Sequence, residues 1–121
     1  MRIEIHARQF ELPDNLRQHI ERRLQFALSW ADHSLQKVTL RLQDINGPKG
    51  GLDKSCLIQV PVVGSKPVVI EEIQADWHMA IDRAIERAGR AVNRTLERRR
   101  QHSHKRYRAP LLDDNLPGVP S

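Results

Sequence analysis

The sequence predicts an α+β domain with the element order β-α-β-β-β-α, folded as a four-stranded mixed sheet with two helices packed on one face. Four short segments alternate apolar and polar residues, as strands with one buried face do. Two longer segments repeat apolar residues every three or four positions, which is typical of amphipathic helices. Of the 121 residues, 39% are hydrophobic, which is enough to fill one core and excludes wholesale disorder.

The N-terminal part of the chain predicts a strand followed by a helix. Residues 2–8 place Ile3, Ile5 and Ala7 on one face of a strand and mostly charged side chains on the other. Pro13 suits the first position of a helix. The apolar face of that helix consists of Leu16, Ile20, Leu24, Ala27 and Leu28, and the helix is expected to fade near residues 30–34.

Three further strands are expected at residues 37–44, 56–62 and 67–73, each with alternating apolar side chains. A glycine-rich loop over residues 46–51 separates the first two of these, and a tight turn at Gly64-Ser65 separates the last two. The strands on either side of the first helix should run parallel if they are neighbours, and the remaining pairs should run antiparallel.

A long helix is predicted from about Ala75 to about His102. Its apolar face consists of Trp77, Ile81, Ala84, Ile85, Ala88, Val92 and Thr95. Prolines and a glycine after Ala109 disfavour regular structure near the C-terminus. We therefore expect one domain over residues 1–105 and a flexible tail over residues 106–121.

Positive charge is concentrated in the long helix. Residues 76–108 hold 10 Lys and Arg against 4 Asp and Glu, whereas the whole chain holds 20 against 15. Such a local excess predicts an anionic partner, for which nucleic acid is the first candidate and a membrane surface the rival.

The arginines of the long helix form a ladder. Arg83, Arg87, Arg90, Arg94 and Arg98 follow one another at spacings of 4, 3, 4 and 4 residues, so they share a face away from the apolar one. Guanidinium groups bind phosphate bidentately and remain charged at physiological pH. We predict a polyanion-binding face; the alternative is a solvated face with ion pairs such as Glu86–Arg90.

The first helix adds a smaller basic surface. Arg22 lies opposite its apolar face with Arg23 beside it, and both are predicted to contact phosphate. Phe26 lies on the same side. We expect its ring to pack under the following segment, which holds Trp30; the alternative is that the ring stacks on an unpaired base.

The sequence predicts no enzyme, no cofactor and no metal site. It contains no P-loop, dinucleotide-binding or serine-nucleophile motif, and its histidines have no carboxylate or cysteine arranged for metal binding. The single cysteine, Cys56, alternates with core residues and is expected to be buried. Without an apolar segment of signal-peptide or membrane-span length, a cytoplasmic location is the expected default.

Several segments together resemble one known family. They are Arg2-Ile3-Glu4-Ile5, Glu11-Leu12 ahead of Leu16-Arg17, and the run Asp76-Trp77-His78-Met79-Ala80-Ile81-Asp82 that opens the basic helix. With the element order, they resemble the ribosome hibernation-promoting factor and ribosome-associated inhibitor A family, also called ribosome subunit interface proteins, over about residues 1–105.

The resemblance implies a fold similar to double-stranded-RNA-binding domains and a protein that binds the small ribosomal subunit. Members of the family occupy the cleft between head and body, contact ribosomal RNA where messenger and tRNA anticodons lie, and inhibit translation in stressed or stationary-phase cells. Arg87, Arg90 and Arg94 match basic or RNA-facing positions of the family's second helix, and Arg22 and Arg23 match basic positions of its first.

The resemblance is to the short form of the family. About twenty residues follow the basic helix, too few for the extra domain with which long-form members pair ribosomes. A separate ribosome-dimerising factor is therefore a possible further partner, whereas no small-molecule substrate and no membrane are expected.

Two other functions remain open at this stage. The first is a general double-stranded RNA-binding module with no preference for the ribosome. The second is a protein-interaction domain for an acidic partner or for itself, which would use the open face of the sheet. That face is expected to present Arg2, Glu4, His6, Lys37, Thr39, Arg41 and Gln59, a mixture of charges without apolar residues that disfavours a large stable interface.

Overall fold

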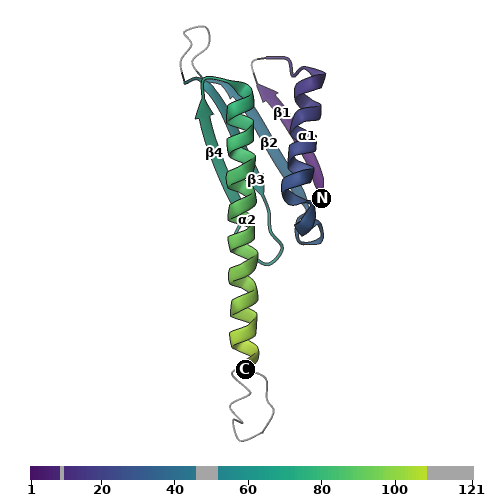
Figure 1. The fold of residues 1–121 in the computed structure, drawn as a ribbon, viewed down its shortest axis with the longest axis vertical. Helices are drawn as coiled ribbons and strands as arrows, with labels where there is room; N and C mark the ends of the chain where they lie inside the picture. Colours follow the sequence, from purple (N-terminus) through teal and green to yellow (C-terminus); the bar gives the residue numbers. More distant parts are fainter. Residues whose placement is uncertain (9, 46–51, 109–121) are drawn as a thin grey trace, which may run out of the picture.

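The computed structural model describes residues 1–8, 10–45 and 52–108, with the backbone alone for residues 102–108 (Figure 1). The predicted loop at 46–51 and the residues of the predicted tail from 109 onward lie outside the described residues. Within the described part of the chain, no helix is both long and apolar enough to cross a membrane.

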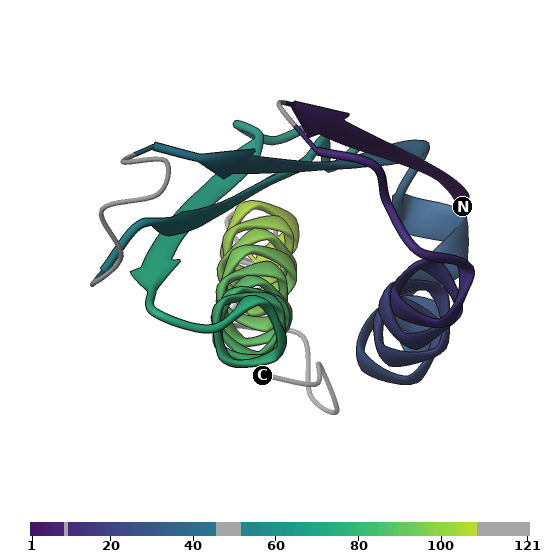
Figure 2. The same cartoon turned by 90° about the horizontal axis from the view of Figure 1, so that it is seen from above.

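The predicted fold class is confirmed. The elements are β1 (Arg2–Arg8), α1 (Asp14–Leu28), the 3-10 helix η1 (Ser29–Ser34), β2 (Lys37–Asp44), β3 (Lys54–Val60), β4 (Val68–Gln74) and α2 (Trp77–Arg108). The sheet has the order β1-β2-β3-β4, with β1 parallel to β2 and the other pairs antiparallel. Both helices lie on the same face of the sheet (Figure 2).

The core lies between the sheet and the two helices. The strands contribute alternate residues, among them Val38, Leu40, Leu42, Cys56, Ile58 and Val60, and each is fully buried. The apolar face of α1 contributes Leu16, Ile20, Leu24 and Leu28, and that of α2 contributes Ala80, Ile81, Ala84, Ile85, Ala88 and Val92. Burying each large aliphatic side chain contributes about 1.5–3 kcal/mol to the stability of the fold. The apolar contacts between the sheet and the two helices therefore hold the helices in place.

Helix ends differ from the sequence prediction by a few residues. Pro13 occupies the cap position of α1, and Asp14 is the first helical residue. The side chain of Asp76 accepts a hydrogen bond from the backbone N–H of Met79 at 3.1 Å, so α2 begins one residue after this cap. The helix then continues to Arg108, and proline, the residue that breaks helices most strongly, is absent from the sequence between Trp77 and Pro110.

The turn between β3 and β4 shortens the predicted third strand. The backbone N–H of Ser65 donates to the carbonyl of Val62 at 3.0 Å, and Gly64 between them has a φ of 78°. A positive φ at the third residue of a four-residue turn favours glycine. Val62 therefore belongs to the turn and pairs with Leu35 in an isolated bridge, while β3 ends at Val60.

Candidate nucleic-acid interface

The two helices present a basic surface on the side away from the sheet. Helices α1 and α2 lie on the same face of the sheet (Figure 2), and α2 continues well past the end of the sheet (Figure 1). All five ladder residues of α2 and Arg22 of α1 are exposed, and Arg23 is half-buried between the helices. We call the exposed side of α1 and α2 that carries Arg22, Arg23, Arg83, Arg87, Arg90, Arg94 and Arg98 the outer helix face.

Two arginines of the ladder are engaged by carboxylates. A guanidinium nitrogen of Arg87 lies 2.6 Å from a carboxylate oxygen of Glu72 on β4 and also donates to the carbonyl of Glu71 at 2.9 Å. Arg90 pairs with Glu86 at 2.9 Å, one helical turn away. The hydrogen bond from Arg87 is the main reason why the pKa of Glu72 lies below its usual value. Arg87 thus ties α2 to the edge of the sheet.

Four arginines of the outer helix face have no such partner. Among the described residues, no carboxylate forms an ion pair with Arg22, Arg83, Arg94 or Arg98. Exposed guanidinium groups without a carboxylate can bind phosphate without first breaking an ion pair.

Polar contacts hold the two helices together at one end of their interface. Nε2 of His19 on α1 lies 2.8 Å from Oδ1 of Asp82 on α2, and Nε of Arg23 lies 3.5 Å from the same oxygen. The rings of His19 and His78 are 5.0 Å apart. These contacts bring Arg23 beside α2, where it lines the same hollow as Arg90.

The two arginines that follow Arg98 on α2 are engaged within the protein. Arg99 donates a hydrogen bond to the carbonyl of Val63 in the turn between β3 and β4. Its guanidinium therefore points toward the sheet side of α2. Arg100 lies 3.8 Å from Glu97 on the same helix.

The expected packing of Phe26 is wrong. Its side chain is 82% exposed, and Trp30 is 48% exposed. The segment after α1 fills the core with Ala31 and Leu35 instead, both nearly inaccessible. The indole N–H of Trp30 donates to the carbonyl of Ala27 at 2.7 Å, which holds the ring near α1 and away from the core.

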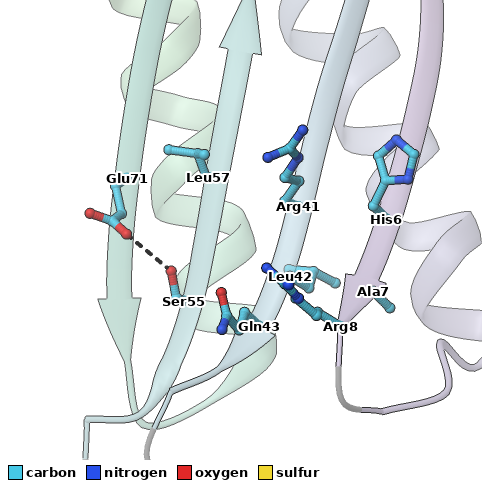
Figure 3. A pocket seen from close by; sticks show the side chains of 9 residues that line it. All are labelled: His6, Ala7, Arg8, Arg41, Leu42, Gln43, Ser55, Leu57 and Glu71. Carbon is cyan, nitrogen blue, oxygen red and sulfur yellow. Dashed lines mark hydrogen bonds between the residues drawn. The ribbon is translucent and has the colours of Figure 1, made fainter.

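The open face of the sheet carries a second hollow, of about 450 Å³. His6, Arg8 and Arg41 line it from β1 and β2, and Glu71 lines it from β4, where it accepts a hydrogen bond from Ser55 at 3.3 Å (Figure 3). The residues predicted to form this face do so, but an absence of apolar side chains was wrongly expected. Val69 and Ile73 are exposed on β4, on the same side of the sheet as Glu71.

Opposite charges cluster further along the open face. The carboxylate of Glu4 lies 3.3 Å from His6, 3.4 Å from Lys37 and 3.8 Å from Arg2. The hydrogen bond with His6, followed by that with Lys37, lowers the pKa of Glu4. Because Glu4 also engages the cationic groups of Lys37 and Arg2, part of the positive charge on the open face is compensated.

Cys56 is buried, as predicted. Burial in the core raises the pKa of its thiol to about 12, which disfavours the reactive thiolate. In the described part of the chain, no group of His, Cys, Asp and Glu side chains is arranged to hold a metal ion.

The topology and the basic outer helix face define an α+β domain with a candidate polyanion-binding surface on its helices. Residues 3–100 match the model of the family described as Sigma 54 modulation protein / S30EA ribosomal protein, and the chain belongs to that family. This confirms the family indicated by the sequence resemblance.

Solved structures agree with this assignment. The chain is similar to the N-terminal domain of Protein Y from Thermus thermophilus, with 30% identity and a TM-score of 0.63, over 78% of this chain and 98% of that one. It has the same fold as a ribosomal subunit interface protein from Coxiella burnetii, with 16% identity and a TM-score of 0.67, over 78% and 96% of the two chains. The comparison with curated proteins finds no significant match.

Proposed function

We propose that the protein binds the small ribosomal subunit through ribosomal RNA and inhibits translation by occupying the cleft between head and body. There it would block the messenger and tRNA sites and promote ribosome hibernation under stress or in stationary phase. Family membership supports this proposal, as does the similarity to a structure named a ribosomal subunit interface protein.

The observation that carries the proposal is the set of exposed arginines without carboxylate partners on the outer helix face. Arg83, Arg94 and Arg98 lie along α2, and Arg22 lies on α1. A helix rises 1.5 Å per residue, so the ladder from Arg83 to Arg98 is about 22 Å long and spans several phosphates. Arg23, Arg87 and Arg90 are placed to add contacts once RNA competes for their carboxylate partners.

The proposed inhibition needs binding and no covalent chemistry. Residues 1–105 would be the ribosome-binding domain, acting in the cytoplasm without a cofactor or a small-molecule substrate. Pairing of ribosomes, if it follows, would depend on a separate dimerising factor.

Co-sedimentation with purified small subunits tests the proposal. The protein should pellet with the subunits at about 0.1 M salt and be released at about 0.5 M, because each neutralised phosphate releases counterions. An excess of free duplex RNA should not displace it. Displacement by duplex RNA would indicate a general RNA-binding module, and failure to pellet at either salt concentration would refute ribosome binding.

A further inference from the structure

An aromatic hollow lies between α1 and α2 on the outer helix face. Its volume is about 450 Å³. The residues that line it come from α1 and η1 (Arg23, Phe26, Ala27 and Trp30) and from α2 (Ile85, Glu86, Gly89, Arg90 and Asn93). Phe26 is more exposed than any other large hydrophobic side chain in the described part of the chain. Phe26 and the partly exposed Trp30 together form an apolar surface rimmed by polar side chains, and such surfaces mark binding sites.

The floor of the hollow is apolar and shallow. Gly89 has no side chain, and a Cβ there would lie 3.7 Å from the carbonyl oxygen and 3.8 Å from the Cβ of Ala27. The two helices therefore approach each other closely at this point, with Ile85 buried beneath. An apolar floor between the two helices offers a contact surface to an aromatic ligand.

The walls of the hollow combine rings with positive charge. Trp30 uses its one polar atom in the hydrogen bond to Ala27, which leaves the ring itself as an apolar, oriented surface. Arg23 and Arg90 stand on opposite helices at the rim, and the exposed amide of Asn93 lies beside them. An aromatic surface flanked by guanidinium groups is the combination that binds unpaired nucleotides.

We propose that this hollow binds an unpaired base of RNA, which stacks on Phe26 while Arg23 and Arg90 contact the adjacent phosphates. The inference rests on the proposed function and deepens it, because it assigns the outer helix face to a single-stranded or looped segment of RNA. In a duplex the base faces are covered by their neighbours, so Phe26 would find no surface to stack on.

Charge favours RNA over the other possible occupants of the hollow. A second copy of this chain would bring two arginine ladders together, and like charges would oppose the contact. An apolar protein partner would have to desolvate the guanidinium groups of Arg23 and Arg90 at the rim of the hollow. A polyanion gains from the same guanidinium groups.

The test compares two RNA probes: a stem-loop with 2-aminopurine in its loop, and the same stem as a blunt duplex. Phe26→Ala should weaken binding of the stem-loop about tenfold and leave duplex binding and its salt dependence unchanged. Phe26→Trp should restore the affinity, and Gln25→Ala, an exposed neighbour on α1, should have no effect. Wild-type protein should quench the 2-aminopurine fluorescence, and Phe26→Ala should not.

The outcomes separate this inference from the proposed function. If Phe26→Ala binds the stem-loop as tightly as wild type while Arg83→Glu with Arg94→Glu loses binding, the stacking site is refuted and the phosphate-binding face stands. If wild-type protein binds neither probe nor small subunits, both proposals fail. If Phe26→Ala instead converts a dimer to a monomer in sedimentation, the hollow holds a second copy of the chain and the inference is overturned.

Discussion

Asp82 on α2 lies 2.8 Å from His19 on α1, so one carboxylate joins the two helices that carry the basic surface. The same oxygen lies 3.5 Å from Arg23, which is thereby held beside α2. The two helices are far apart in sequence. The distance between them in the folded protein determines how far the arginines of α1 lie from those of α2. Asp82 is consequently a positioning residue for the outer helix face.

The contact between His19 and Asp82 should be measurable in a double-mutant cycle. Asp82→Ala, His19→Ala and the double variant should each unfold at lower urea concentration than wild type, with a coupling of about 0.5–1 kcal/mol because both side chains are partly exposed. Additive effects of the two substitutions would show that the contact does not stabilise the helix pair.

The ion pair between Glu72 and Arg87 should make stability depend on pH. The pKa of Glu72 is lowered in the folded protein, so its contribution is present above the unfolded value near 4.5 and is lost as the pH falls through the folded value. Glu72→Gln should therefore reduce the free energy of unfolding at pH 7 and converge with wild type in acid. Urea titrations from pH 7 to pH 3 test this, with the exposed Glu86→Gln as the control; a constant difference would contradict it.

The two described glycines should respond oppositely to alanine. Gly64 has a φ of 78°, which strains any residue with a Cβ, so Gly64→Ala should cost about 1 kcal/mol of stability. Gly89 lies within α2, and a Cβ there meets Ala27 at ordinary contact distances, so Gly89→Ala should stabilise by about 0.5–1 kcal/mol. Thermal unfolding of both variants checks the signs, and a stabilising Gly64→Ala would refute the turn geometry.

Cys56 should react with thiol reagents only when the protein unfolds. The thiol is fully buried and its pKa is raised to about 12, so both access and thiolate formation are suppressed in the folded state. Labelling at pH 8 should be slow in buffer and fast in denaturant. Rapid labelling in buffer would show that β3 opens readily.

Local periodicity was sufficient to predict much of the fold. Alternation at Ile3, Ile5 and Ala7 and at Val38, Leu40 and Leu42 predicted β1 and β2 with their observed bounds. Spacing on α2 separated the buried Ile81 and Ile85 from the exposed arginines. Both patterns depend only on residues within one strand or helix, so they can be predicted from the sequence alone.

The features that were missed depend on contacts between elements. Glu72 is a β4 residue that meets Arg87 only after α2 packs on the sheet, and Arg99 reaches Val63 in the same way. The exposure of Phe26 depends on Ala31 and Leu35 filling the space that an aromatic ring was expected to occupy. Residue spacing along the chain does not predict which side chain occupies such a position in the core.

The ion pairs also determine which variant tests the binding face. Arg87→Glu would break the tie to Glu72 and place like charges together, so a loss of binding could reflect damage to the fold. Arg83 and Arg94 form no ion pair with another described residue and are both exposed, and the charge of Arg83 contributes less than that of Arg87 to the lowered pKa of Glu72. Arg41, exposed on the open face of the sheet, offers a control with the same change of charge.

Co-sedimentation of these variants with small ribosomal subunits at about 0.1 M salt tests the central claim most directly. Wild type and Arg41→Glu should pellet with the subunits, whereas Arg83→Glu with Arg94→Glu should remain in the supernatant with an unchanged unfolding midpoint. Pelleting of the double variant to the wild-type extent would contradict the assignment of the outer helix face as the ribosome-binding surface.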